Sequence, residues 1–151
     1  MPERQLSQTI AFVADTDQAP QRTLSTLRWA DTDLNGHVTH PVFVEFFQNG
    51  RAQFLAERAW RLSPGMRWVT RHLTIDYLGE VFWPGSVEIL TRVVRLGSSS
   101  SIHFKQSLLH GADTKATASA VMVLVDTATA RSVAIPEAVR HLLCPHAGGT
   151  L

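Results

Sequence analysis

The sequence predicts an α+β fold in which a five-stranded antiparallel sheet wraps around one long helix. Three observations support this prediction. Apolar side chains recur at three- and four-residue steps from about 40 to 60, which is the spacing of one buried helical face. After residue 66 the pattern changes to four strand-like segments, separated by clusters of Gly, Pro, Ser and Asp. A further strand-like segment, 23–29, precedes the helix.

The size and charge of the chain favour a single domain and exclude several classes of partner. A length of 151 residues with 44% apolar side chains suits one sizeable core and does not indicate a membrane protein. The 14 basic and 13 acidic side chains give a formal charge of +1, so we expect neither nucleic acid nor an acidic membrane surface as a partner. The only cysteine, Cys144, cannot form an internal disulfide, which fits a reducing compartment and predicts a cytoplasmic protein.

The expected domain boundaries follow from composition. Residues 1–20 are polar, end at a proline and contain no apolar core of signal-peptide length, so they are expected to form a lead-in. Residues 21–145 are expected to form the single domain, and the Gly-containing residues 146–151 a flexible tail.

Two carboxylates follow the first strand. Asp31 and Asp33 stand at i and i+2, and Leu34-Asn35-Gly36 then breaks the extended pattern with turn-forming residues. In an extended segment i and i+2 share a face, so spacing alone does not separate the two acids. They are either turn and capping residues, for which Asp is common, or the carboxylates of a site.

The helix is expected from His40 to Trp60, ended by Ser63-Pro64-Gly65. Its predicted buried face consists of Phe43, Phe46, Phe47, Gly50 and Phe54, and its polar residues, which fall largely elsewhere, are Glu45, Gln48, Asn49 and Arg51. Gly50 costs roughly 1 kcal/mol relative to Ala inside a helix, which predicts that a strand backbone passes close to that face.

The start of this helix is a candidate site. Pro41 marks the first turn, where an N–H has no partner inside the helix, so the neighbouring amides, including that of His40, remain donors. A carboxylate just upstream can attack a carbonyl or activate water, while such a donor stabilises the resulting oxyanion. His37 and His40 could together suggest a metal site, but histidines that flank a tight turn more often bond its backbone, so no metal is predicted.

The four later strands are expected at about 66–78, 86–96, 101–110 and 115–126, followed by a short helix over 136–143. One helix cannot cover both faces of such a sheet, so an exposed face or edge is expected to meet a second subunit.

A small-residue loop between two of these strands has two readings. Gly97 to Ser101 can be a plain hairpin turn. Alternatively, Ser98 and Ser99, with Arg95 or Lys105, can receive phosphate groups, because hydroxyl and cationic groups suit phosphate oxygens. No serine lies in a G-x-S-x-G elbow, so a serine hydrolase mechanism has no support.

The pattern D-x-D-x-x-G-H-V, followed by an aromatic-rich helix that ends in Arg, resembles the hotdog-fold acyl-CoA thioesterases of the 4-hydroxybenzoyl-CoA thioesterase type. The residues that carry it are Asp31, Asp33, Gly36, His37, Val38, Phe43, Phe47 and Arg51. Similarity continues at Ile75 to Leu78, Trp83 to Val87, Val125-Asp126 and Ile135 to Glu137. The chain departs from the family at Thr39 and His40, where two asparagines are common, at Phe43 in place of Tyr and at Gln48 in place of Glu.

The resemblance implies a hotdog fold and hydrolysis of an acyl-CoA thioester by water, without a cofactor. It assigns catalysis to Asp33, as nucleophile or general base, and oxyanion stabilisation to the backbone N–H of His40. The expected substrate-binding residues are Gly36, Thr39, Pro41, Ser98 and Ser99. Some other hotdog branches use a helix glutamate, which makes Glu45 a second candidate acid.

The resemblance also implies a homodimer with sites at its interface, or a tetramer built from such dimers. Two rival functions keep the fold, a non-catalytic acyl-CoA-binding module and a hotdog hydratase. The retained Asp33 favours hydrolysis. Aromatic, short polar and fatty acyl groups, on coenzyme A or an acyl-carrier protein, all remain open as substrates.

Overall fold

The computed structural model describes residues 19–59 and 64–143, so the predicted tail and almost all of the predicted lead-in fall outside the described residues. The elements are β1 (Gln21–Thr26), a 3-10 turn η1 (Trp29–Asp31), α1 (His40–Arg58), β2 (Met66–Tyr77), β3 (Ser86–Leu96), β4 (Ser101–His110), β5 (Asp113–Asp126) and α2 (Glu137–Leu143). Among the described helices, none is both long and apolar enough to cross a membrane.

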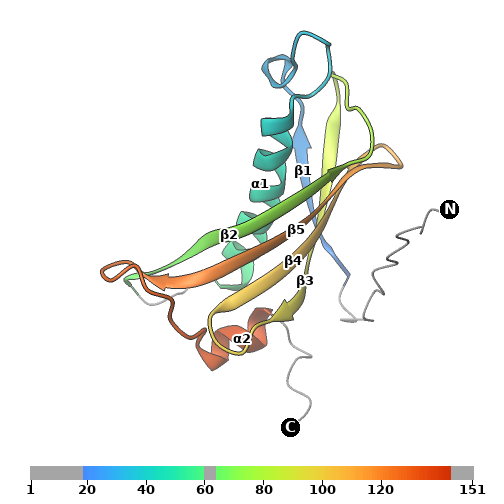
Figure 1. The fold of residues 1–151 in the computed structure, drawn as a ribbon. Helices are drawn as coiled ribbons and strands as arrows, with labels where there is room; N and C mark the ends of the chain where they lie inside the picture. The colour runs from blue at the N-terminus through green and yellow to red at the C-terminus, as the bar shows by residue number, and fades with distance from the viewer. Residues whose placement is uncertain (1–18, 60–63, 144–151) are drawn as a thin grey trace, which may run out of the picture.

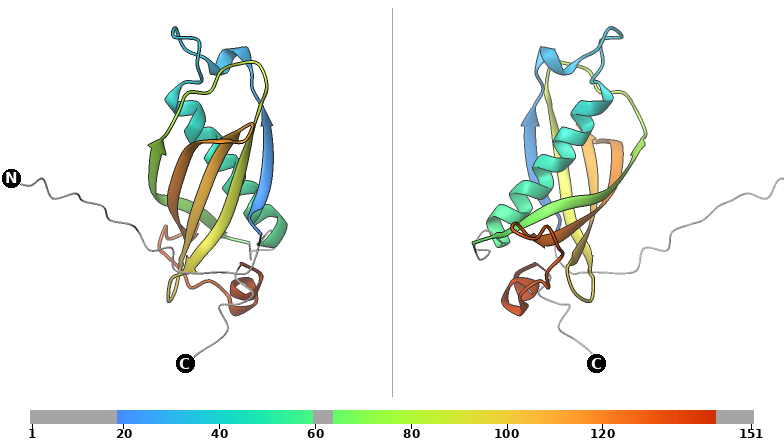
Figure 2. Two further views of the ribbon diagram at one scale, coloured as in Figure 1. Left: turned by 90° about the vertical axis from the view of Figure 1, so that its right-hand side faces the viewer. Right: turned by 60° about the vertical axis from the view of Figure 1, so that its left-hand side comes forward.

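The strands form one antiparallel sheet in the order β1-β3-β4-β5-β2, so β1 and β2 are its edges. The sheet curls around α1, which lies against one face, and α2 lies at the end where α1 stops (Figures 1 and 2). The predicted α+β hotdog architecture is therefore confirmed, with a helix of moderate length, 19 residues.

The element boundaries lie within a few residues of the predicted ones, and the first and last strands show the clearest differences. β5 begins at Asp113, two residues earlier than expected, and the first strand ends at Thr26 rather than near Trp29. The strand stops because Trp29 to Asp31 turn into a 3-10 helix, in which the Asp31 carboxylate accepts the N–H of Arg28. The predicted end of α1 at Trp60 lies outside the described residues, and the described helix is capped by Ala59.

The core fills the space between α1 and the sheet. The predicted buried face of α1 is confirmed, since all five of its residues are buried. The N-terminal half of α1 packs into one apolar cluster with β3, β4 and β5, and the C-terminal half packs into a second cluster that includes α2.

Arg51 contradicts the predicted polar face, because its side chain is buried against the sheet. Its Nη1 donates to Gln106 Oε1 at 2.8 Å, while Gln106 Nε2 donates to the Phe47 carbonyl and to Thr91 Oγ1, both at 2.9 Å. Burial lowers the pKa of Arg51. The three- and four-residue spacing could not show that Arg51 is buried. Burial of a guanidinium requires a hydrogen-bond partner, and here the partner, Gln106, lies on a strand that is distant in the sequence.

Gly50 faces the sheet at close range, as its position in the helix suggested. A Cβ added there would lie 2.7 Å from Thr91 Oγ1, 2.9 Å from Gln106 Nε2 and 2.9 Å from Ile89 Cγ2. The neighbours are thus side chains of β3 and β4 rather than strand backbone. The glycine lets the helix settle onto them.

We expect Gly50→Ala to destabilise the protein by about 1–3 kcal/mol, because overpacking at these contacts outweighs the helix propensity gained. Chemical denaturation measures the effect. Gly79→Ala is the matched control, since its nearest neighbour is the flexible Lys115 Cδ at 3.2 Å, and it should be close to neutral. Equal effects from both substitutions would contradict the close approach at Gly50.

Candidate functional site

The start of α1 has the features of an oxyanion-binding helix terminus. Thr39 is the N-cap, with an extended backbone, and Pro41 lies in the first turn as predicted. The N–H of Val42 donates to the Thr39 carbonyl at 3.1 Å, whereas that of His40 donates to no group among the described residues. A partnerless N–H at a helix N-terminus, reinforced by the helix dipole, favours negative charge.

A surface pocket of about 340 Å³ lies beside this helix start. It is lined by His37, Val38, His40, Phe43, Tyr77, Leu78, Gly79 and Glu80. The end of β2 and the segment after it therefore form one wall, and the start of α1 forms the other. The Tyr77 ring lies 4.7 Å from the His40 ring and 5.3 Å from the Phe43 ring, measured between centroids. The pocket thus combines an aromatic wall with the end of a helix.

Asp33 lies in a tight turn just before this pocket. Its N–H donates to the His37 carbonyl and its own carbonyl accepts the N–H of Gly36, both at 3.0 Å. Gly36 takes a positive φ of 81°, which this turn requires and glycine adopts without strain. Asp33 is exposed as a residue, its side chain is 33% accessible, and its Oδ1 accepts the N–H of Asn35 at 2.8 Å. Oδ1 of Asp33 therefore holds the turn, whereas Oδ2 takes no part in it.

His37 connects this turn to the pocket. Its Nδ1 lies 3.9 Å from Asp33 Oδ2, and its Nε2 lies 3.8 Å from Glu80 Oε1. The backbone of His37 also forms an antiparallel bridge with Phe82, which fixes the hairpin against the segment after β2. Sequence reasoning treated His37 as part of the turn and missed that its side chain lines the pocket between two carboxylates.

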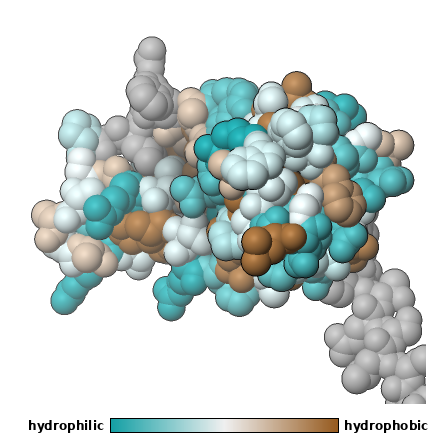
Figure 3. Space-filling view, turned by 90° about the horizontal axis from the view of Figure 1, so that it is seen from above, coloured by the Kyte–Doolittle hydropathy of each residue, from teal (hydrophilic) through white to brown (hydrophobic). Residues whose placement is uncertain are grey.

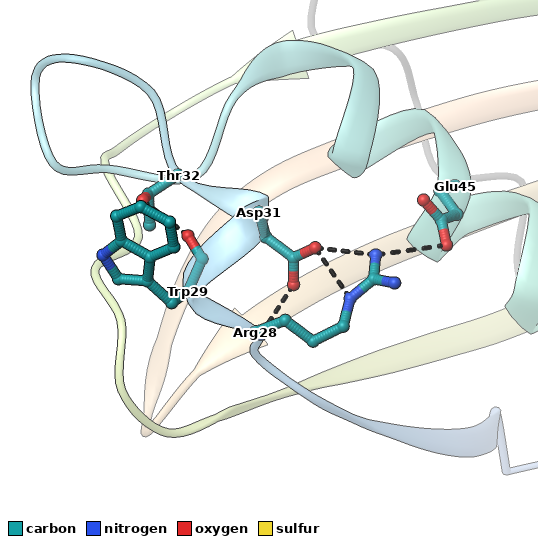
Figure 4. A network of polar contacts seen from close by, with 5 residues as sticks. All are labelled: Arg28, Trp29, Asp31, Thr32 and Glu45. Atoms are coloured by element: carbon teal, nitrogen blue, oxygen red, sulfur yellow. Dashed lines mark hydrogen bonds and ion pairs between the residues drawn. The ribbon is translucent and has the colours of Figure 1, made fainter.

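Asp31 has a structural role that separates it from Asp33. It is 1% exposed, and its carboxylate accepts the Arg28 N–H at 2.7 Å and Arg28 Nε at 3.0 Å, while Arg28 Nη2 lies 2.7 Å away (Figure 4). The structure separates the two acids, which spacing alone did not, because the 3-10 turn ending at Asp31 interrupts the extended backbone and leaves Asp31 buried and Asp33 exposed. The capping role expected for Asp therefore accounts for the presence of Asp31.

Glu45 lies on α1 near the same arginine. Its Oε1 is 3.7 Å from Arg28 Nη2, and its side chain is half exposed (Figure 4). Asp31, followed by Glu45, raises the pKa of Arg28. Glu45 therefore belongs to a surface ion pair with Arg28, whose guanidinium lies between Asp31 and Glu45, and it does not line the pocket.

The other predicted substrate-binding residues fall into two groups. Gly36, Thr39 and Pro41 lie around the start of α1. Ser98 and Ser99 lie in the β3–β4 turn, near α2, where Arg140 donates to the carbonyls of Gly97 at 2.9 Å and Ser99 at 3.4 Å. Since 19 helical residues span about 28 Å, one chain does not bring these serines to the pocket at His40.

The side chains that could hold a metal are not grouped for it. Among residues 19–59 and 64–143, no three His, Cys, Asp or Glu side chains come together as metal ligands. His37 instead faces Asp33 and Glu80, and His40 stacks near Tyr77.

Apolar side chains are exposed around the pocket end of the molecule. Seen from above, these apolar side chains lie among polar groups and do not form one continuous patch (Figure 3). The exposed large apolar residues here are Trp29, Leu34, Tyr77, Leu78, Phe82 and Trp83. Exposed apolar surface of this kind suits contact with an apolar ligand or another chain.

Comparisons with known proteins agree with this architecture. Residues 27–143 match the family model of the thioesterase-like superfamily. No curated protein matches the chain. A crystal structure of a Pseudomonas aeruginosa protein is 28% identical, with a TM-score of 0.76 over 85% of this chain and 92% of that one.

Two further solved structures are similar. A protein from Bacillus stearothermophilus, described as a predicted thioesterase, is 25% identical with a TM-score of 0.76, covering 83% of this chain and 94% of that one. A Staphylococcus aureus protein solved in complex with CoA is 16% identical with a TM-score of 0.76, covering 87% of each chain. The last likeness is one of fold alone.

Proposed function

Because the chain belongs to the thioesterase-like superfamily, we propose that it is an acyl-CoA thioesterase, which hydrolyses its substrate to a free acid and coenzyme A. The observation that carries this proposal is the pocket at the start of α1, where the Asp33 hairpin is followed in the chain by the His40 N–H, which has no partner among the described residues. A protein of the same fold was solved in complex with CoA, which supports coenzyme A as the thiol part of the substrate.

Asp33 supplies the carboxylate in this proposal. Its Oδ1 is engaged by the Asn35 amide, whereas its Oδ2 accepts no hydrogen bond among the described residues and faces His37 at 3.9 Å. In one route Oδ2 attacks the thioester carbonyl, the CoA thiolate leaves, and water then hydrolyses the mixed anhydride. In the other route the carboxylate takes a proton from a water molecule as that water attacks the carbonyl. Both routes use the same side chain.

The His40 amide stabilises the oxyanion that forms in either route. A backbone donor at a helix N-terminus is held in place before the reaction, so little reorganisation is needed as charge develops on the carbonyl oxygen. The acyl group would contact the aromatic wall of Phe43 and Tyr77. Gly36, Thr39 and Pro41 would border the thioester.

We propose that the functional unit is a homodimer. β2 is a 12-residue edge strand bonded only to β5 in the described sheet, and Tyr77 and Leu78 at its end are exposed beside the pocket. A long free edge is a ready site for another strand, and a second subunit there would complete the pocket wall. Contact of Ser98 or Ser99 with the CoA phosphates would likewise have to come from another subunit.

We therefore expect dilute protein to scatter light with the mass of a dimer or of a dimer of dimers. A fully active monomer in the wild-type protein would contradict the proposal.

The proposed activity is tested by thiol release from a panel of aromatic, short polar and fatty acyl-CoA esters. We expect multiple turnovers on at least one class, and the ratio of kcat/KM values identifies the acyl group. Binding of acyl-CoA without thiol release would contradict hydrolysis.

A further inference from the structure

The face of the sheet turned away from α1 carries a hollow of about 280 Å³. Gln106 and Thr91 face α1, and successive side chains of a strand alternate between faces, so Lys105 and Arg92 face outward. Both residues line the hollow, and β2 and β5 complete it. The hollow therefore lies on the surface opposite the core.

The strand register builds this hollow as two adjacent rows. In the first, Arg92 pairs with Lys105, Lys105 with Ser119, and Ser119 with Thr74. The second row is Leu90, Ser107, Thr117 and Asp76, paired in the same manner. Two cations thus lie opposite each other at one end, and four hydroxyl groups cover the middle.

Such a pair of cations has a physical consequence. Like charges directly opposite on neighbouring strands repel and destabilise the pair, because their Cβ atoms lie only about 5 Å apart. An oxyanion beside them would be attracted to both cations, and neighbouring hydroxyls could donate to its remaining oxygens. Arginine in particular matches the geometry of phosphate oxygens.

The surroundings extend this positive field. Arg95 and His103 pair in the next outward row, with Arg95 Nη2 2.9 Å from His103 Nε2. Burial, followed by the charge of Arg95, lowers the pKa of His103. Asp76 is the one carboxylate among the residues that line the hollow, and it lies at the far end of the second row. An anion would therefore be drawn to the Arg92–Lys105 end.

We propose that this hollow is an anion-binding site that takes a phosphate group, either free or as part of a nucleotide. The site is distinct from the thioester pocket, because Tyr77 contacts α1 while its neighbour Asp76 faces the opposite side of β2. Lys105 and Arg92 hold the charge of the phosphate, and Ser107 and Ser119 donate hydrogen bonds. The inference does not depend on the proposed hydrolase activity.

The test is calorimetric titration of the full-length protein at fixed ionic strength with inorganic phosphate, pyrophosphate and adenosine 3′,5′-bisphosphate, with adenosine as the uncharged control. We expect binding of the phosphorylated probes and none of adenosine. Tighter binding of adenosine 3′,5′-bisphosphate than of pyrophosphate would identify a nucleotide as the source, and the reverse order a free phosphate.

Three variants make the site assignment falsifiable. Lys105→Gln should weaken binding about tenfold or more, as expected for loss of one charge-assisted hydrogen bond. Asp76→Asn should strengthen binding, because it removes the carboxylate that repels an anion. Arg131→Gln removes an equal charge from the exposed segment after β5 and should leave binding unchanged.

Several outcomes would overturn the proposal. One is the absence of phosphate binding by the wild-type protein, and another is equal weakening by Lys105→Gln and Arg131→Gln, which would show only a general charge effect. A change in sedimentation with Lys105→Gln and no phosphate binding would assign the face to contact with a second copy instead. If Lys105→Gln failed to fold, Arg92→Gln and Asp76→Asn would still have to shift affinity in opposite directions.

Discussion

Replacement of Asp33 by asparagine is expected to lower kcat for acyl-CoA hydrolysis by at least about 10²-fold, the lower range for loss of acid–base catalysis. Asparagine has nearly the shape of aspartate, and its amide oxygen can still accept the Asn35 N–H that holds the turn. Because Asp33 is not part of the buried core, thermal stability should change little. The measurement is kcat beside the unfolding midpoint of the same preparation.

Two other carboxylates provide the controls. Asp31→Asn should reduce stability by about 1–3 kcal/mol, since it removes a buried acceptor of three donor groups on Arg28, but its effect on turnover should be milder than that of Asp33→Asn. Glu45→Gln should be close to wild type in both. Unchanged hydrolysis by Asp33→Asn, with loss of activity in Asp31→Asn or Glu45→Gln, would refute the assignment of the acid.

Replacement of His40 by proline should lower kcat about 10²–10³-fold, the typical effect of removing one oxyanion donor. Proline deletes the backbone N–H together with the imidazole, and the first position of a helix tolerates it. Thr39 already has the extended backbone (φ −74°, ψ 151°) that a residue before proline requires. The helix should therefore still form, which circular dichroism can verify.

His40→Asn is the matched variant, because it removes the imidazole and keeps the N–H. It should retain activity. A large loss in His40→Asn, with the fold intact, would assign the role to the imidazole, and full activity in His40→Pro would exclude the amide.

The fold could be predicted because it depends on local periodicity. The apolar spacing of Phe43, Phe46, Phe47 and Phe54 gave the buried face of α1, and alternating segments between turn residues gave β2 to β5 with ends close to those observed. Both signals are patterns of residues that are close in the sequence, so they can be recognised without knowledge of the tertiary structure.

The candidate site was harder to predict from the sequence than the fold, because it depends on contacts between distant segments. The burial of Arg51, for example, depends on Gln106, 55 residues away. The pocket joins residues of the first hairpin to Tyr77 and Glu80, which no spacing rule connects. Only the family resemblance distinguished Asp33 from Asp31.

The most direct test of the central claim is mass spectrometry of the products formed from an α,β-unsaturated acyl-CoA. A thioesterase releases the unsaturated acid and free coenzyme A over many turnovers, and Asp33→Asn should abolish most of this release. A hydratase would instead yield an acyl-CoA heavier by one water, with no free thiol, and a binding module would return the substrate unchanged. Free acid and coenzyme A are the predicted products, and hydrated acyl-CoA with an intact thioester would contradict the account.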